Sequence, residues 1–325
     1  MCGIFLVYSK NKKINKKKCL KSVSSLKRRG PDKNKYEFFN NSLFIFNSVL
    51  SITGKLDITN KLYRSSNKNF YLTYNGEIYN YKELSKKYFK NQYFSNDSDL
   101  LINLFAYSKN KKTFLQSING MYSFVVYDKI KNKIYFCSDI QGEKRLYKFE
   151  NNNELVLSST ISAIIDYIGG DQIYPQIFND YINTRHFNFL ENTIYKSIIP
   201  VEPGKLFEFD FYTSKLRNQN IENIFDWIDE KRYREFERMD YREIVEYFDN
   251  LFREQISIMI PNRKFGTICS GGIDSSLQTR MISEYNEDYI VGAIHHKGKD
   301  KITENLVDFE RYINKRIQIF NANVK

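Results

Sequence analysis

Phe70-Tyr-Leu-Thr-Tyr-Asn-Gly-Glu-Ile-Tyr-Asn80 is the most informative stretch of this 325-residue chain, because it joins a strand pattern to a turn signal. It opens with aromatic and branched side chains, which favour a β-strand. Asn75-Gly76 follows, and this dipeptide is typical of tight turns. Six further segments of similar character are predicted as strands: 4–8, 42–47, 122–128, 133–138, 154–159 and 205–211.

Helices are expected among these strands, at 16–27, 97–107 and 161–168. Short strands with a few helices favour stacked antiparallel sheets with helices outside them, an α+β fold, over a parallel sheet. The chain is also long enough for two ordinary domains, each with its own core.

The pattern changes near residue 213. Segment 221–260 is charged, and from Tyr241 to Met259 its apolar residues recur at helical spacing, which predicts a helix with one buried face. Four elements follow: a strand at 265–269, a Ser/Gly-rich loop, a helix at 275–284 and a strand at 289–295. This order is one unit of a parallel α/β sheet.

Composition limits the possible classes of function. Hydrophobic residues make up 42% and aromatic residues 16% of the chain, which indicates a folded globular protein. The net charge is +12, but the lysines are scattered and no nucleic-acid-binding motif accompanies them, so no nucleic acid partner is expected. No apolar run approaches the ~20 residues that span a bilayer, and the apolar stretch 4–8 is too short for a signal peptide. We therefore expect a cytoplasmic protein with no membrane partner.

The cysteines are Cys2, Cys19, Cys137 and Cys269, and their spacing matches no zinc or redox pattern. No metal site made by protein side chains alone is expected. Cys2 differs from the others because its small side chain permits removal of Met1, which would leave a free α-amino group beside the thiol. Such an amine titrates at about pH 8 and can act as a base toward its own side chain. Cys2 is thus a candidate N-terminal nucleophile.

Four segments follow Cys2 in order: Arg28-Arg-Gly-Pro-Asp32, Tyr74-Asn-Gly-Glu-Ile-Tyr-Asn80, Asn96-Asp-Ser-Asp99 and Gly120-Met-Tyr-Ser-Phe124. With Cys2 they resemble the class II glutamine amidotransferase domain, and the first two are close to those of glutamine-hydrolysing asparagine synthetases. The resemblance covers residues 2–211. It implies stacked antiparallel sheets with outer helices, of the N-terminal nucleophile hydrolase type.

The resemblance also implies roles for single residues. Cys2 attacks the side-chain amide of glutamine, and the Asn75 amide and the Gly76 N–H form the oxyanion hole. Two such donors stabilise the charge that develops in acyl transfer. Asp97 holds the ammonium group of glutamine. The other residues expected around glutamine are Gly76, Glu77, Leu50 and Ile52.

One departure from the family pattern concerns the carboxylate of glutamine. The family has an arginine shortly before a Leu-Ser-Ile segment, and this arginine pairs with the substrate carboxylate. Val49 stands at that place here, before Leu50-Ser-Ile52. Valine cannot make a bidentate contact to a carboxylate, so the efficiency of glutamine use stays open.

Ser270-Gly-Gly-Ile-Asp-Ser-Ser276 lies between a predicted strand and a predicted helix. Glycines allow the backbone to approach phosphate oxygens, and a helix N-terminus supplies N–H donors. The loop resembles that of the ATP pyrophosphatases, which implies ATP and Mg²⁺ as cofactors. The residues expected at ATP are Ser270, Gly271, Gly272, Asp274, Ser275 and Ser276, with Asp274 holding Mg²⁺ or the loop itself.

Three regions result: the amidotransferase domain at 2–211, a linker at 212–240, and a partial ATP-binding domain of the asparagine synthetase type at 241–325. The expected reaction amidates aspartate, through an acyl-adenylate, with ammonia from glutamine. Only residues 277–325 follow the loop, so we expect the synthetase half to be incomplete in this chain. A second chain that completes it and a homodimer both stay open. So do two alternative functions: amidation of another carboxylate acceptor, and a non-catalytic regulatory module.

Overall fold

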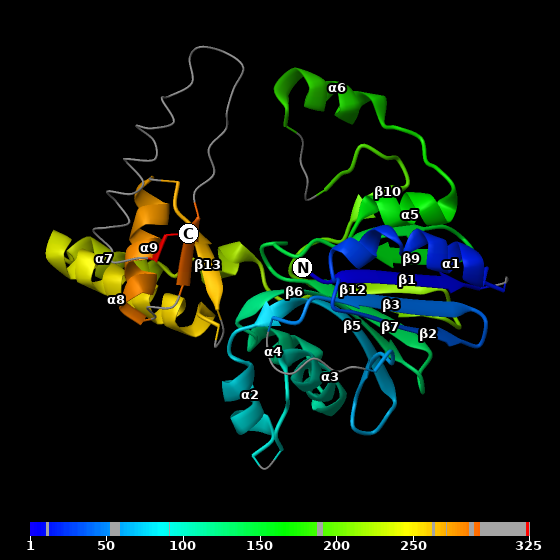
Figure 1. The fold of residues 1–325 in the computed structure, drawn as a ribbon, viewed down its shortest axis with the longest axis horizontal. Helices are drawn as coiled ribbons and strands as arrows, with labels where there is room; N and C mark the ends of the chain where they lie inside the picture. The colour runs from blue at the N-terminus through cyan, green and yellow to red at the C-terminus, as the bar shows by residue number, and fades with distance from the viewer. Residues whose placement is uncertain are drawn as a thin grey trace. The chain divides into compact units, whose positions relative to one another are not determined.

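The computed structural model of the chain divides into two compact units, Met1–Ile228 and Asp229–Lys325 (Figure 1). The structure describes residues 1–10, 13–52, 59–90, 92–186, 191–261, 264–270, 272–285, 289–292 and 323–324. None of the helices in these ranges is both long and apolar enough to cross a bilayer.

Two six-stranded sheets form the first unit, and their strands pair antiparallel throughout. One sheet has the order β10-β8-β9-β1-β3-β2 and consists of β1 (Gly3–Ser9), β2 (Lys33–Phe39), β3 (Leu43–Val49), β8 (Tyr147–Glu150), β9 (Glu154–Ser158) and β10 (Ile198–Pro200). The other has the order β12-β11-β7-β6-β5-β4 and consists of β4 (Tyr63–Arg64), β5 (Phe70–Ile78), β6 (Gly120–Asp128), β7 (Lys133–Ser138), β11 (Lys205–Asp210) and β12 (Lys215–Asn220).

The two sheets stack face to face because alternate residues of each strand point to opposite faces. Ile4 and Leu6 of β1 pack with Val125 of β6 in the core between the sheets. Phe5 and Val7 pack on the opposite face of β1, under helices. The helices on that face are α1 (Lys16–Ser22), the 3-10 turn η1 (Ser25–Arg28) and α5 (Ile161–Ile168).

Three helices cover the outer face of the second sheet (Figure 1): α2 (Tyr81–Tyr88), α3 (Asp97–Tyr107) and α4 (Lys111–Gln116). Leu72 and Tyr74 of β5 pack there with Leu101 of α3. The unit also contains α6 (Pro175–Thr184) and the 3-10 turn η2 (Ile224–Trp227). Stacked antiparallel sheets with outer helices, the α+β class predicted from the sequence, are therefore confirmed.

The predicted turn at Asn75-Gly76 is wrong. Strand β5 continues to Ile78, and Asn75 and Gly76 pair with Ser123 and Tyr122 of β6. Glycine is needed here for close approach, since a Cβ on Gly76 would lie 2.3 Å from the carbonyl oxygen of Met121. Pairing within the sheet has overridden the local preference of the dipeptide for a turn.

The segment expected to be a linker, 212–240, contains regular structure. Strand β12 extends the second sheet by pairing with β11, so residues 212–228 belong to the first compact unit.

Strand β2 was not predicted from the sequence either. It is an edge strand of the first sheet, and its alternating lysines are typical of such strands.

The second unit contains α7 (Glu230–Arg238), α8 (Tyr241–Met259), β13 (Phe265–Ile268), α9 (Ile273–Tyr285), β14 (Tyr289–Gly292) and β15 (Asn323–Val324). Its sheet has the order β13-β14-β15, and the pairing is parallel. The predicted order of strand, loop, helix and strand is therefore present. The end of the second predicted strand, 293–295, lies outside the described residues.

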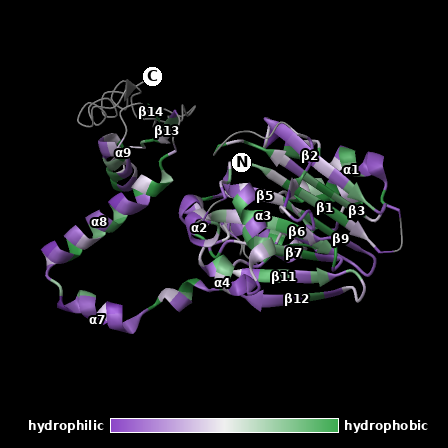
Figure 2. Cartoon of the chain, turned by 90° about the horizontal axis from the view of Figure 1, so that it is seen from below, coloured by the Kyte–Doolittle hydropathy of each residue, from purple (hydrophilic) through white to green (hydrophobic). Residues whose placement is uncertain are grey.

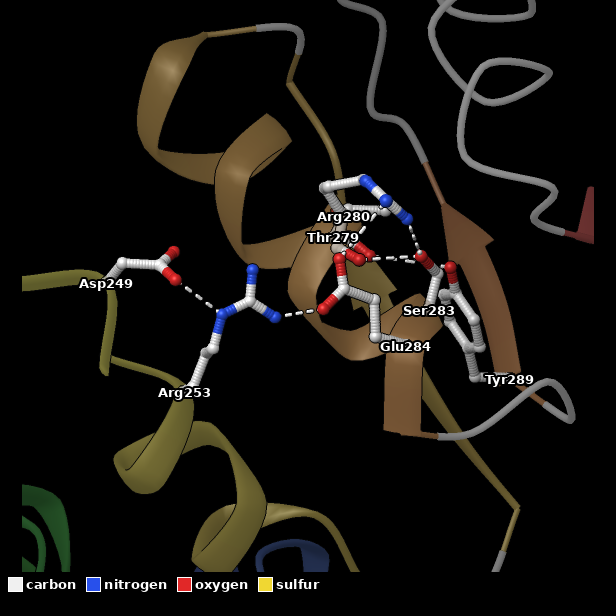
Figure 3. Close-up of polar contacts among 7 residues, drawn as sticks. All are labelled: Asp249, Arg253, Thr279, Arg280, Ser283, Glu284 and Tyr289. Carbon is white, nitrogen blue, oxygen red and sulfur yellow. Dashed lines mark hydrogen bonds and ion pairs between the residues drawn. The ribbon is translucent and has the colours of Figure 1, made fainter. Parts of the chain in front are cut away.

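Helix α8 is attached to α9 by charged side chains and by a small core. Arg253 of α8 pairs with Asp249 at 2.6 Å and with Glu284 of α9, as Figure 3 shows. Ile256 of α8 packs in the core that includes Met281 of α9. Helix α7 is hydrophilic along most of its length (Figure 2).

The buried face predicted for α8 is wrong for most of its residues. From Tyr241 to Met259, six of the apolar side chains at helical spacing are 38 to 81% exposed: Tyr241, Ile244, Val245, Phe248, Leu251 and Met259. The helical period itself is correct, and the helix is continuous. Spacing predicts that a helix has an apolar face, but it does not say what covers that face.

Candidate active site

A small cavity of about 30 Å³ opens at the start of β1 and brings together segments that are far apart in the sequence. Five of the residues predicted at the glutamine site line it: Cys2, Leu50, Ile52, Gly76 and Asp97. Two larger hollows of the first unit, of about 440 and 690 Å³, are lined by none of the predicted residues. The chemistry of the lining, rather than volume, therefore locates the candidate site.

Cys2 is held through both its side chain and its backbone. The Leu50 amide donates a hydrogen bond to Sγ at 3.3 Å, and the Arg29 side-chain Nε donates to the Cys2 carbonyl at 3.0 Å. Burial raises the pKa of the thiol above its ordinary value, while the Leu50 hydrogen bond and the N-terminal positive charge lower it. The thiol is thus protonated at rest and needs a base before it can attack.

The N-terminal amine is close enough to Cys2 for the two groups to influence each other's pKa. In the structure the amine belongs to Met1, and burial is the main cause that lowers its pKa. A lowered pKa increases the neutral fraction of an amine at pH 7, and only the neutral amine accepts a proton.

The segment Arg28–Asp32 makes hydrogen bonds to Cys2 and to the 50–51 segment beside it. The sequence alone did not predict this role. Arg29 binds the Cys2 carbonyl, and the Asp32 carboxylate accepts from the Ser51 amide at 2.8 Å. Gly30 lets the turn lie against β3, since a Cβ there would approach the carbonyl carbon of Ser48 to 2.3 Å. The motif itself was recognised from the sequence, but these long-range partners leave no local signal.

Asn75 is the predicted oxyanion donor, and its side chain is 1% exposed. Among the described residues its Nδ2 atom has no hydrogen-bond partner. Leaving a buried donor without an acceptor costs about 1–3 kcal/mol, a cost that a bound ligand oxygen would remove. Gly76, the next residue, lines the cavity. The position and the missing acceptor fit a donor reserved for a ligand oxygen.

Asp97 begins α3 and is almost fully buried. It is not the helix cap, because Asn96 accepts from the Asp99 amide at 2.8 Å in that role. The Asp97 carboxylate instead accepts from the Tyr74 hydroxyl at 2.9 Å and from the Ile78 amide at 3.1 Å. Burial raises its pKa, and these hydrogen bonds partly oppose the rise.

Glu77 is a second carboxyl group close to Asp97. Burial and the charge of Asp97 raise its pKa, while Lys144 lowers it. Two acidic groups near one partly closed site favour a ligand that carries a positive charge there. This charge pattern agrees with the predicted place for the ammonium group of glutamine.

Val49 is 5% exposed and lines the cavity beside Leu50. The structure therefore places an apolar side chain at the position where the family pattern has arginine. Six further lining residues were not predicted at the site: Asn47, Ser51, Tyr63, Tyr74, Asn96 and Ser98.

The predicted ATP loop connects β13 to α9 in the second unit. The Ser275 hydroxyl accepts from the Ser270 amide at 3.2 Å and lies 3.1 Å from the Ser270 hydroxyl. Ser276 is buried against Cys269, so it faces the core rather than the loop. Asp274 and Gly272 are exposed, and Gly271 lies outside the described residues.

The stacked sheets and the thiol at the start of β1 are those of amidotransferases with the N-terminal nucleophile type of fold. A family model described as a glutamine amidotransferase domain matches residues 1–219, and the chain belongs to this family. A solved structure titled as the allosteric regulatory enzyme of purine biosynthesis has a similar fold, with a TM-score of 0.50 and 16% identity over 95% of this chain and 70% of that chain.

The curated relatives are named as asparagine synthetases, which confirms the resemblance predicted from the motifs. A putative glutamine-hydrolysing asparagine synthetase of Methanocaldococcus jannaschii is 26% identical over 88% of this chain and 58% of its own length. A glutamine-hydrolysing asparagine synthetase of Gallus gallus is 22% identical over 89% of this chain and 50% of its own length. The chain spans about half the length of the curated relatives it matches.

Proposed function

We propose that the first unit releases ammonia from glutamine, with Cys2 as nucleophile once Met1 has been removed. One observation carries the proposal. Cys2, Gly76 and Asp97 line one cavity, and the adjacent residue Asn75 has a buried amide nitrogen without an acceptor among the described residues. A nucleophile, an unused oxyanion donor and an anchor for a cation are the parts that glutamine hydrolysis needs.

In the proposed reaction the Cys2 α-amine takes the thiol proton, and the thiolate attacks the side-chain carbonyl carbon of glutamine. Negative charge develops on the carbonyl oxygen, and each donor of the Asn75–Gly76 pair stabilises it by about 3 kcal/mol. The C–N bond then breaks, and ammonia leaves with the proton that the amine held. Water attacks the resulting thioester, which releases glutamate and returns a proton to the thiol.

Binding requires some movement at the site. The cavity has a volume of only about 30 Å³, so we expect lining side chains to move when glutamine enters. Asp97 and Glu77 then face the ammonium group, while Leu50 and Ile52 line the path of the aliphatic chain. Side-chain rearrangement of this kind is common when ligands bind.

We further propose that the ammonia reacts with an acyl-adenylate formed from ATP and aspartate, giving asparagine, AMP and pyrophosphate. Aspartate comes from the names of the relatives, and another carboxylate is the alternative acceptor. The Ser270 and Ser275 hydroxyls, with the N–H groups at the start of α9, suit phosphate oxygens.

The described residues contain no cluster of three side chains suited to a metal ion. Mg²⁺ commonly binds through ATP phosphates and one or two carboxylates, and Asp274 in the first turn of α9 can supply one. The proposal therefore needs no all-protein metal site.

The test is covalent labelling of the full chain by 6-diazo-5-oxo-L-norleucine, a glutamine analogue whose diazoketone alkylates an activated thiol. We expect one adduct per chain, on Cys2, with loss of labelling when glutamine competes. Intact mass gives the adduct and the removal of Met1, and peptide mapping gives the site. If Cys2 reacts with iodoacetamide but not with the glutamine analogue, glutamine use is refuted and the non-catalytic alternative is favoured.

Val49→Arg is expected to lower the reagent concentration that gives half-maximal labelling by about tenfold, since a charged hydrogen bond adds about 1.5–3 kcal/mol. The reason is a new guanidinium contact to the carboxylate of the analogue. Labelling rates over a concentration series measure the change. Val49→Leu is the control, because it keeps an apolar side chain and should leave the value unchanged. No improvement in a folded Val49→Arg protein would contradict a carboxylate site beside this residue.

A further inference from the structure

Asn47 of β3 is fully buried and uses its side-chain amide to bind the backbone of two other strands. Its Nδ2 donates to the Gly3 carbonyl at 3.0 Å and to the Tyr74 carbonyl at 3.0 Å, with the Ser48 carbonyl at 3.3 Å. Its Oδ1 accepts from the Tyr74 amide at 3.2 Å. All these partners are backbone groups.

The partners are adjacent to the two chemical groups of the site. Gly3 directly follows Cys2, and Tyr74 directly precedes Asn75. Gly3 belongs to β1 in one sheet and Tyr74 to β5 in the other, so no ladder hydrogen bonds join them. The Asn47 side chain therefore connects the backbone beside the nucleophile to the backbone beside the oxyanion donor.

Few side chains could make these contacts. The Tyr74 backbone presents both an acceptor and a donor, and a side-chain amide matches both at once. Aspartate could only accept and would face three carbonyl oxygens. Leucine, of similar size, would leave buried carbonyls and an N–H without partners, which costs about 1–3 kcal/mol for each group.

We propose that Asn47 is a positioning residue, which sets the separation between the Cys2 thiol and the Asn75–Gly76 donors by tying β1 to β5. The proposal rests on the proposed glutamine chemistry. Asn47 donates no group to the reacting atoms and acts through the backbone of its neighbours. Displacing reacting groups by about 1 Å can reduce a rate about 100-fold, so such a tie affects the chemical step more than binding.

Thr73, the residue before Tyr74, offers a matched control. The Thr73 hydroxyl donates to the Phe46 carbonyl at 2.9 Å and is also buried, so it too joins β5 to β3. Within the described residues its hydroxyl makes no hydrogen bond to Gly3 or Tyr74. Thr73→Val removes a hydrogen bond between the same sheets without loosening the contacts that hold the nucleophile and the donor.

The experiment measures labelling of the full chain by 6-diazo-5-oxo-L-norleucine, with the rate at saturation and the half-saturating concentration obtained separately. For Asn47→Leu we expect the saturated rate to fall about 100-fold, with a change in half-saturation of no more than about threefold. Asn47→Ser keeps one donor and disturbs the core less, so its saturated rate should lie between those of Asn47→Leu and the wild type. It replaces Asn47→Leu in the experiment if that variant does not fold. Thr73→Val should lower the thermal midpoint but keep the saturated rate within about threefold.

Two results would overturn the inference while leaving glutamine use intact. One is a saturated rate within threefold of wild type for the folded Asn47 variants. The other is an equal fall in rate for Thr73→Val, which would assign the effect to stability alone. If the wild-type protein itself is not labelled, the proposed glutamine chemistry fails, and the inference fails with it.

Discussion

Cys2→Ala is expected to abolish release of glutamate from glutamine, a loss on the order of 10⁴-fold or more, as when the nucleophile of other acyl-transfer enzymes is removed. Alanine provides no atom that can form the thioester, and no other thiol lines the cavity. The binding groups around the site are expected to stay in place, because the hydrogen bonds that Sγ makes within the described residues involve Leu50 alone. Binding of glutamine should therefore persist while turnover is lost.

Glutamate release measured in the full chain, together with glutamine binding by calorimetry, separates these two effects. Cys19→Ala is the matched control, since Cys19 is a fully buried cysteine of α1 that packs in a different core. It should lower stability but keep glutamine turnover. Turnover that persists in Cys2→Ala after removal of Met1 would exclude Cys2 as the nucleophile.

The parts of the fold that could be predicted are those with a strong local pattern. Helices α3 and α5 coincide with the predicted 97–107 and 161–168, and β7 coincides with 133–138. In these segments composition and periodicity agree with the tertiary environment. The helix expected at 16–27 is instead α1 followed by η1, a difference confined to its last turns.

The failures have one physical cause, which is that the partner lies far away in the sequence. Asn75-Gly76 has the pattern of a turn, but it pairs with β6. The apolar face of α8 has the pattern of a buried face, but the described residues of the second unit leave most of it exposed. Arg29 and Asn47 bind backbone groups that are distant in the sequence, and such contacts produce no periodic sequence pattern from which they could be predicted. Cys2, Gly76 and Asp97 could be predicted as site residues because the ordered motifs resemble a known family. No local pattern of residues indicated their roles.

The site also explains why a donor without a partner is tolerated in the core. Asn75 directly follows Tyr74, whose backbone the Asn47 side chain connects to Gly3 of β1. The unsatisfied N–H of Asn75 costs about 1–3 kcal/mol, and a ligand oxygen offsets that cost. Stability and activity should therefore respond in opposite directions when this donor is removed.

Asn75→Leu is expected to reduce kcat for glutamine hydrolysis by about 10²–10³-fold, the usual effect of losing one oxyanion donor. KM should change little, because the donor acts on charge that appears in the transition state. The thermal midpoint should stay unchanged or rise, since leucine has a similar size and replaces a buried amide nitrogen that has no partner among the described residues.

Steady-state glutamate release and thermal unfolding of the full chain measure both effects. Asn80→Ala is the control within the same motif, because the Asn80 side chain binds Ser117 and Asn119 and does not line the cavity. It should lower the midpoint and leave kcat nearly unchanged, the reverse of Asn75→Leu. A kcat within about threefold of wild type in Asn75→Leu would show that the unpaired amide is not an oxyanion donor, since such donors supply roughly 2.7–4 kcal/mol.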